Sequence, residues 1–158
     1  MIKGILCLLA KQNPKSFDND LDVILDNSWL KIASSKNYHH FFPKVWFKTD
    51  YKECEYFYIN HIANITIVDG YLNKHKIGGK SPSKYINEFA NKNNNIINTL
   101  ATHLICMDSD GINDNNYDVF YDNRCKHIAD KLSEFIIEQE HGTTALEVYA
   151  DNAVEEID

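Results

Sequence analysis

The chain has few of the features that mark several common protein classes. Its cysteines form no Cys-x-x-Cys pair, which argues against a zinc knuckle, and without an export signal their scatter argues against a disulfide framework. They are Cys7, Cys54, Cys106 and Cys125. The glycines at 78 and 79 are too sparse for a phosphate-binding loop, and no segment repeats.

Long hydrophobic runs are also absent. The opening stretch MIKGILCLLAKQ is too short to span a membrane and lacks the small-residue cleavage site of a secretory signal. Its pattern predicts an amphipathic helix over residues 3–12 instead. We therefore expect a cytoplasmic protein with no membrane partner.

What is present indicates a globular chain. The 158 residues are 44% hydrophobic and 12% aromatic, enough for a single domain with a buried core, which we place at residues 1–140. Residues 141–158 carry five acidic residues and no lysine or arginine, and we expect a flexible acidic tail there.

Charge is unevenly distributed. The formal net charge is −7, yet residues 36–84 hold eight lysines against four acidic residues. This asymmetry predicts one face that receives an anion on an otherwise acidic protein. The alternative is that the lysines cluster by chance on a solvated face.

Periodicity and turn residues predict an α+β fold that is mostly helical. We expect strands at 38–42 and in the segment NITIVDG, and a short helix at YLNKHK. A strand or extended piece from Leu21 should lead to a helix capped near residues 26–28, and residues 43–60 should be helical in part. Further helices are predicted at 82–90, 93–106 and 117–140.

The segment YHHFFPK places two adjacent histidines in apolar surroundings. His39 and His40 precede Pro43, Asn64 precedes the second predicted strand, and Asn73 lies in the short helix that follows. Two strands and a helix can bring a base, a metal ligand and a bracing amide to one phosphate. Metal-assisted cleavage of a phosphodiester requires such a convergence.

These residues resemble the motif of HNH, or ββα-metal, nucleases: Asp or His, then His-x-x-Pro, then an Asn before a strand and an Asn in a helix. The resemblance implies that His40 is the general base and that Asn64 braces the loop that carries it. It also implies that His39 and Asn73 are metal ligands. The ββα-metal core would occupy about residues 37–80, embedded among packed helices.

A wider stretch, about residues 3–140, is similar to the C-terminal HNH region of GmrSD-type modification-dependent restriction and phage-defence proteins. This resemblance implies DNA as the substrate and a divalent metal cofactor, Mg²⁺ or Mn²⁺, with Zn²⁺ or Ni²⁺ as alternatives. It also implies a partner, an N-terminal nucleotide-binding and specificity domain or subunit that this chain does not include.

Each assignment has a structural alternative. His39 could be a hydrogen-bonded packing residue, and Asn73 an ordinary amide on a helix surface. The lysines expected to bind DNA phosphates could simply be solvated; they are Lys44, Lys74, Lys76 and Lys80. His61 and His75 could supply a further ligand, although we expect solvated surface. We expect the nearby aromatic residues in the core rather than as base-stacking platforms; they are Phe41, Phe42, Trp46, Phe47, Tyr56, Phe57 and Tyr58.

Two functions of different classes follow from the sequence. The first is an HNH DNA endonuclease in restriction or phage defence, which the intact His40 and Asn73 favour. The second is a catalytically silent module, derived from such a nuclease, that binds nucleic acid or a protein partner. The net negative charge is compatible with the second.

Overall fold

A computed structural model describes residues 2–25 and 38–135 of the chain. The predicted helix cap at 26–28 and the predicted tail at 141–158 lie outside these residues. The described part is α+β: helices make up about half of it, and two short antiparallel strands form its sheet. The fold class predicted from the sequence is confirmed at this level.

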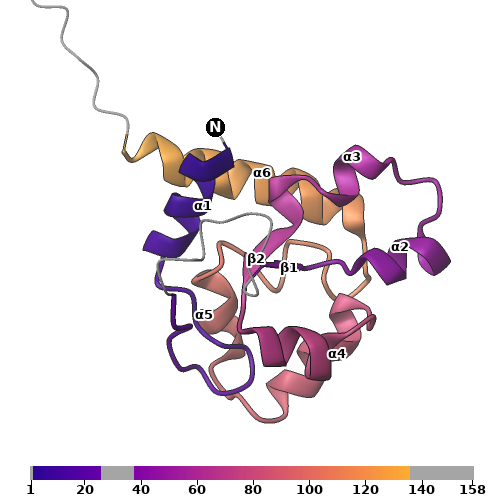
Figure 1. The fold of residues 1–158 in the computed structure, drawn as a ribbon, viewed down its shortest axis with the longest axis horizontal. Helices are drawn as coiled ribbons and strands as arrows, with labels where there is room; N and C mark the ends of the chain where they lie inside the picture. Colours follow the sequence, from indigo (N-terminus) through magenta and orange to yellow (C-terminus); the bar gives the residue numbers. More distant parts are fainter. Residues whose placement is uncertain (1, 26–37, 136–158) are drawn as a thin grey trace, which may run out of the picture.

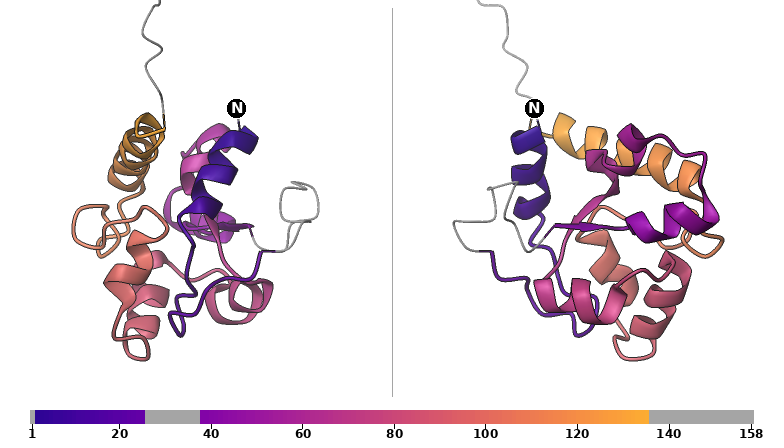
Figure 2. Two further views of the ribbon diagram at one scale, coloured as in Figure 1. Left: turned by 90° about the vertical axis from the view of Figure 1, so that its left-hand side faces the viewer. Right: turned by 45° about the vertical axis from the view of Figure 1, so that its right-hand side comes forward.

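The strands lie in the middle of the molecule, with α1 and α6 on one side and α4 and α5 on the other (Figure 1). The two turned views of Figure 2 show the same arrangement. None of the helices in the described residues is both long enough and apolar enough to cross a membrane. The elements in chain order are α1 (Ile2–Lys11), β1 (Tyr38–His40), α2 (Lys44–Asp50), α3 (Tyr56–Ile59), η1 (Ile62–Asn64), β2 (Ile65–Ile67), η2 (Leu72–Ile77), α4 (Pro82–Ala90), α5 (Ile96–Ala101) and α6 (Tyr117–Ser133).

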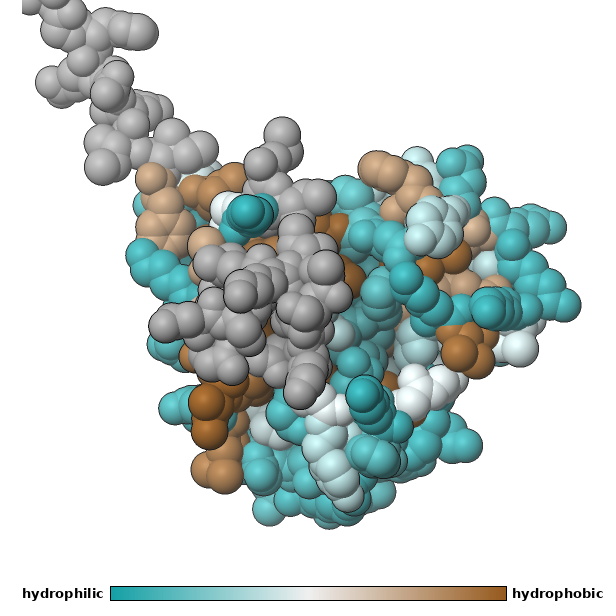
Figure 3. All heavy atoms as spheres, in the orientation of Figure 1, coloured by the Kyte–Doolittle hydropathy of each residue, from teal (hydrophilic) through white to brown (hydrophobic). Residues whose placement is uncertain are grey.

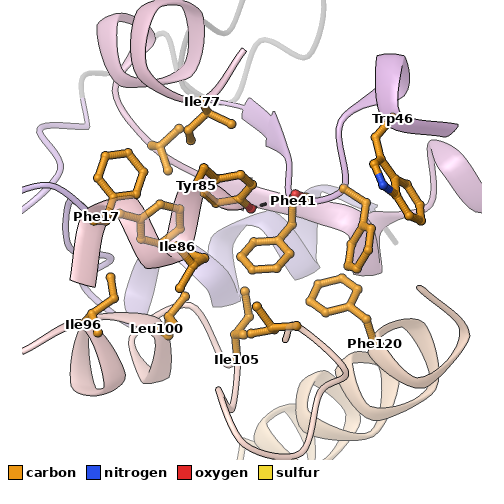
Figure 4. Packing of buried hydrophobic residues seen from close by; sticks show 14 of the residues in the cluster. Phe17, Phe41, Trp46, Ile77, Tyr85, Ile86, Ile96, Leu100, Ile105 and Phe120 are labelled. Carbon is orange, nitrogen blue, oxygen red and sulfur yellow. Dashed lines mark hydrogen bonds between the residues drawn. The ribbon is translucent and has the colours of Figure 1, made fainter. Parts of the chain in front are cut away.

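Aromatic side chains dominate the main core. Phe41 lies at its centre, where its ring stacks on Phe120 with centroids 4.8 Å apart. Its backbone carbonyl accepts a hydrogen bond from the buried hydroxyl of Tyr85, 2.7 Å away (Figure 4). A second, smaller cluster joins α1 to β2 and α6 through Leu8, Ile67 and Ile128. The strands are therefore held between two apolar clusters.

The long helix α6 shows how sequence pattern produces this packing. Its buried residues, at positions 117, 120, 124 and 128, recur at helical spacing and form one face. The Asn116 side chain caps the first turn by accepting from the Val119 N–H, and Asp118 and Lys131 complement the helix dipole. The helix ends at Ser133, so the prediction of helix to residue 140 was too long within the described residues.

Three further predicted elements are shorter than expected. The helix predicted at 93–106 is confined to α5, because the Asn93 side chain accepts from the Asn95 N–H in a turn before it. Leu104 then takes a left-handed backbone conformation (φ 56°), which reverses the chain so that Ile105 enters the core. The strand predicted at 38–42 stops at His40, and the predicted extended piece at 21–25 has only an isolated bridge between Lys15 and Asp22.

The prediction for the aromatic residues of 41–58 is half right. Those at 41, 42, 46 and 47 are buried, as predicted. Tyr56 and Phe57 are instead 77% and 61% exposed, and Tyr58 is 40% exposed. These three lie on α3, a single turn at the outer edge of the molecule with none of its residues buried. One turn is too short to turn all its side chains inward.

Candidate active site

The two histidines of β1 point to opposite faces of the strand. His39 pairs with Thr66 of β2 in the antiparallel ladder and is only 2% exposed, whereas the flanking Tyr38 and His40 are half-buried. Alternation of side chains along a strand produces this difference. One imidazole therefore lies in the interior and the other near the surface.

Asn64 holds the chain immediately after β1. It is fully buried, and its Oδ1 accepts from the Phe42 N–H at 2.8 Å. Its Nδ2 donates to the Phe42 and Ile59 carbonyls at 3.1 and 3.0 Å. The loop-bracing geometry that the sequence analysis expects for Asn64 is therefore present, because one amide ties residues 42, 59 and 64 together.

Asn73, on η2, lies against the inward histidine. Its Oδ1 is 3.1 Å from His39 Nδ1, and its Nδ2 donates to the Tyr38 carbonyl at 3.2 Å. η2 is a wide helical turn in which the Gly78 N–H donates to the Asn73 carbonyl, five residues back. The fold thus brings together the two residues that the sequence proposes as metal ligands.

The hydrogen-bond pattern fixes the tautomer of His39. Because Asn73 donates through Nδ2, its Oδ1 is an acceptor, so His39 donates through Nδ1–H. The lone pair is then on Nε2, which is buried without a partner. Burial lowers the pKa of His39 to about 3 despite the hydrogen bond to Asn73, so this imidazole is neutral at pH 7.

His40 is held in the same way by a residue that the sequence analysis does not single out. Asn60 donates through Nδ2 to the Tyr56 carbonyl, so its Oδ1 accepts from His40 Nε2–H at 3.3 Å. His40 Nδ1 is therefore the basic atom. Burial and the neighbouring Lys44 ammonium lower the pKa of His40, which keeps the ring neutral at pH 7.

The four lysines expected to bind phosphate differ in their surroundings. Lys44 and Lys74 are exposed, and Lys76 is half-buried at the end of η2. Lys80 forms an ion pair with Glu88 of α4. Of the four, Lys44 is the one whose charge lowers the pKa of His40, after the larger effect of burial.

Three further residues that contribute to this region were missed. Lys48 and Lys52 follow Lys44 at four-residue spacing, and all three lysines line one surface cavity between α2 and α3. The four-residue spacing is a signal visible in the sequence. Arg124 of α6 is fully buried and donates to the Ile65 carbonyl at the start of β2. Burial lowers its pKa to about 9. A lone arginine in a helix gives no warning of this role.

Two donors, His39 and Asn73, are of the right type to hold a divalent metal. The described ranges contain no group of three or more His, Cys, Asp or Glu side chains that could bind one. Two ligands on adjacent corners of a coordination sphere with bonds of ~2.1 Å are ~3 Å apart, and the His39 Nδ1–Asn73 Oδ1 distance is 3.1 Å. In the described tautomer His39 Nδ1 carries a proton, so the pair fits an ion only when that proton lies on Nε2 instead.

No protein-family model, no curated protein and no solved structure matches this chain. The likeness to HNH nucleases therefore stays a prediction from the residues quoted above.

The bracing role of Asn64 predicts a large loss of stability on its removal. Asn64→Ala leaves the buried Phe42 N–H without an acceptor and two carbonyls without a donor. We expect the free energy of unfolding to fall by about 2–4 kcal/mol in urea titrations. Asn94→Ala, at an exposed position, is the matched control. A loss below about 1 kcal/mol would contradict the bracing role.

Proposed function

We propose that this chain is a metal-dependent endonuclease domain of the HNH type, which hydrolyses phosphodiester bonds in DNA, in restriction or phage defence. One observation carries the proposal. Strands β1 and β2 and the turn η2 hold two groups on opposite faces of β1: the neutral imidazole of His40 near the surface, and the paired imidazole and amide of His39 and Asn73 inside. Asn64 fixes the chain immediately after β1.

His40 is the general base of the proposed reaction. Its Nδ1 accepts the proton of the attacking water, while Asn60 holds Nε2–H and so fixes the ring orientation. A base that is already neutral at pH 7 needs no proton loss before it acts. The lowered pKa of His40 therefore suits this role.

His39 and Asn73 would hold the metal ion only after the His39 proton moves from Nδ1 to Nε2, which breaks the hydrogen bond to Asn73 and leaves the imidazole neutral. A bound divalent cation would supply charge stabilisation for the reacting phosphate and its leaving oxygen. Lys44 and Lys74, both exposed, would bind phosphates of the DNA backbone.

The second candidate function is a silent binding module. It is favoured by the direct His39–Asn73 hydrogen bond, which pairs His39 Nδ1 with Asn73 Oδ1 without a metal. Nicking of supercoiled plasmid in the presence of Mg²⁺, Mn²⁺, Zn²⁺ or Ni²⁺ separates the two. Nicking that requires a divalent ion and His40 supports the endonuclease, and its absence with every ion supports the module.

The donor pair predicts a preference among metals. A neutral imidazole and an amide should hold Mg²⁺ poorly without DNA, since Mg²⁺ prefers oxygen ligands and keeps its waters, whereas Ni²⁺ suits imidazole. His39→Asp should raise affinity for Mg²⁺ relative to Ni²⁺. Calorimetric titration of both proteins with both ions measures this directly. Unchanged relative affinities would mean that His39 packs and does not bind metal.

A further inference from the structure

A surface cavity of about 320 Å³ lies between α2 and α3 and has a cationic rim. Three lysines line it, at positions 44, 48 and 52, together with the buried Phe47 and the exposed Tyr56. No acidic residue is among the lining side chains. The volume is at the lower end of the range for small-ligand sites.

Charges are segregated around the loop that joins the two helices. A neighbouring cavity of about 450 Å³ is lined by four acidic residues and no lysine. These are Glu53, Glu55, Asp118 and Asp122. Lys52 lines the first cavity, whereas the nearby Glu53 and Glu55 line the second, so the lysine-lined cavity keeps a positive field beside an acidic surface.

The aromatic wall of the cavity is exposed to water. Tyr56 is 77% exposed, and the Lys44 ammonium lies 5.9 Å from the centre of its ring. Figure 3 shows apolar surface among hydrophilic surface on this side of the molecule, at its right. A flat ring beside a cation offers both a stacking face and a charge to a planar anionic ligand.

The cavity adjoins the proposed base. Ile59 lines it, and the next residue, Asn60, holds His40 Nε2–H. Lys44, which also lines the cavity, begins α2 four residues after His40. A ligand in the cavity would therefore lie close to the phosphate at which His40 would activate water.

We propose that this cavity binds one unstacked nucleotide of a single-stranded DNA segment, with its base against Tyr56 and its flanking phosphates on Lys44, Lys48 and Lys52. The inference rests on the proposed function and names its substrate class. Lys44 and Lys48 are four residues apart on α2, which places their side chains ~5–6 Å apart, comparable with neighbouring phosphates of one strand, and Lys52 follows in the loop after α2. Bases inside a duplex are stacked and cannot reach the aromatic wall.

The test measures binding without cleavage. Fluorescence anisotropy in EDTA compares a labelled oligothymidylate with a duplex of equal length, using the full chain. Tyr56→Ala should weaken single-strand binding about 5- to 100-fold, since stacking contributes ~1–3 kcal/mol per base, and Tyr56→Phe should retain it. Lys48→Gln and Lys52→Gln should each lower the slope of log K against log salt by about 0.7.

Two matched controls lie outside the cavity. Phe135 is an exposed aromatic with the Lys11 ammonium 4.1 Å from its ring, and Phe135→Ala should leave binding unchanged. Lys126, an exposed lysine of α6, serves the same purpose for the charge variants. Polyglutamate, added as a competitor of the labelled oligonucleotide, tests whether the cavity binds an acidic peptide instead of DNA.

The outcomes separate this inference from the proposed function. If Tyr56→Ala and the lysine variants bind as the wild type does, or if the duplex binds more tightly than the single strand, the inference is overturned even when plasmid is nicked. Polyglutamate binding that matches DNA binding and ignores Tyr56 also overturns it. If Tyr56-dependent binding occurs but His40→Ala nicks plasmid normally, the cavity stands and the catalytic assignment fails.

Discussion

His40→Ala is expected to reduce DNA cleavage by about 100- to 10,000-fold, the usual contribution of a general base. The protein should stay folded, because His40 is half-buried and its only described side-chain hydrogen bond goes to Asn60. Plasmid nicking with the purified variant, alongside its urea unfolding midpoint, measures both effects. Cleavage at the wild-type rate would show that His40 is not the base.

The pH profile gives a second measurement on the same residue. The pKa of His40 is lowered by burial and then by Lys44, so the base is neutral to lower pH than an ordinary histidine. We expect the cleavage rate to rise with pH and to level off below pH ~6.5, the usual histidine pKa. His127→Gln, a change on α6 that keeps a donor for Asp110, should not alter the profile.

The buried histidines predict a loss of stability in acid. Burial is the main cause that lowers the pKa of His39 to about 3 and that of His103 to about 4. In the unfolded chain both should titrate near 6.5. Between these values the unfolded state binds more protons, so the free energy of unfolding falls as pH falls below 6.5.

Each histidine should cost about 2–3 kcal/mol of stability by pH ~4.5. Urea unfolding at about pH 7.5 and about pH 4.5 measures the total loss in free energy of unfolding. Variants of the single histidines show how much of that loss each one causes. His103→Gln can still donate to the Lys15 carbonyl and should flatten the pH dependence by about that amount. His39→Gln should do the same. His75→Gln, at an exposed position on η2, is the matched control. An equally steep pH dependence in both buried variants would contradict this assignment.

Much of the site geometry could be predicted because the motif is local. Pro43, Asn64 and Asn73 all lie within a stretch of forty residues, and they mark in turn the end of the first strand, the start of the second strand and the helical segment. Asn64 could be assigned a bracing role because a buried amide before a strand has both a donor and an acceptor for backbone groups.

The roles of Asn60 and Arg124 could not be predicted, since each depends on a contact distant in sequence. Asn60 reaches His40 across twenty residues, and Arg124 reaches Ile65 across fifty-nine. The exposure of Tyr56 was also missed. Propensity and hydrophobicity assign an aromatic residue to the core, and only the position of α3 at the edge of the fold overrides that assignment.

The register of β1 against β2 decides which of the two adjacent histidines is buried, because side chains alternate between the two faces of a strand. The β1–β2 ladder is three residues long and aligns His39 with Thr66. A slip of one residue would place the neutral, buried ring at position 40 and put position 39 at the surface, and a slip of two would restore the original order. A ladder of three residue pairs specifies its own register only weakly. The Asn64 side chain is hydrogen-bonded to both the N–H and the carbonyl of Phe42. These bonds fix the register of β1 against β2, and with it which of the two histidines is buried.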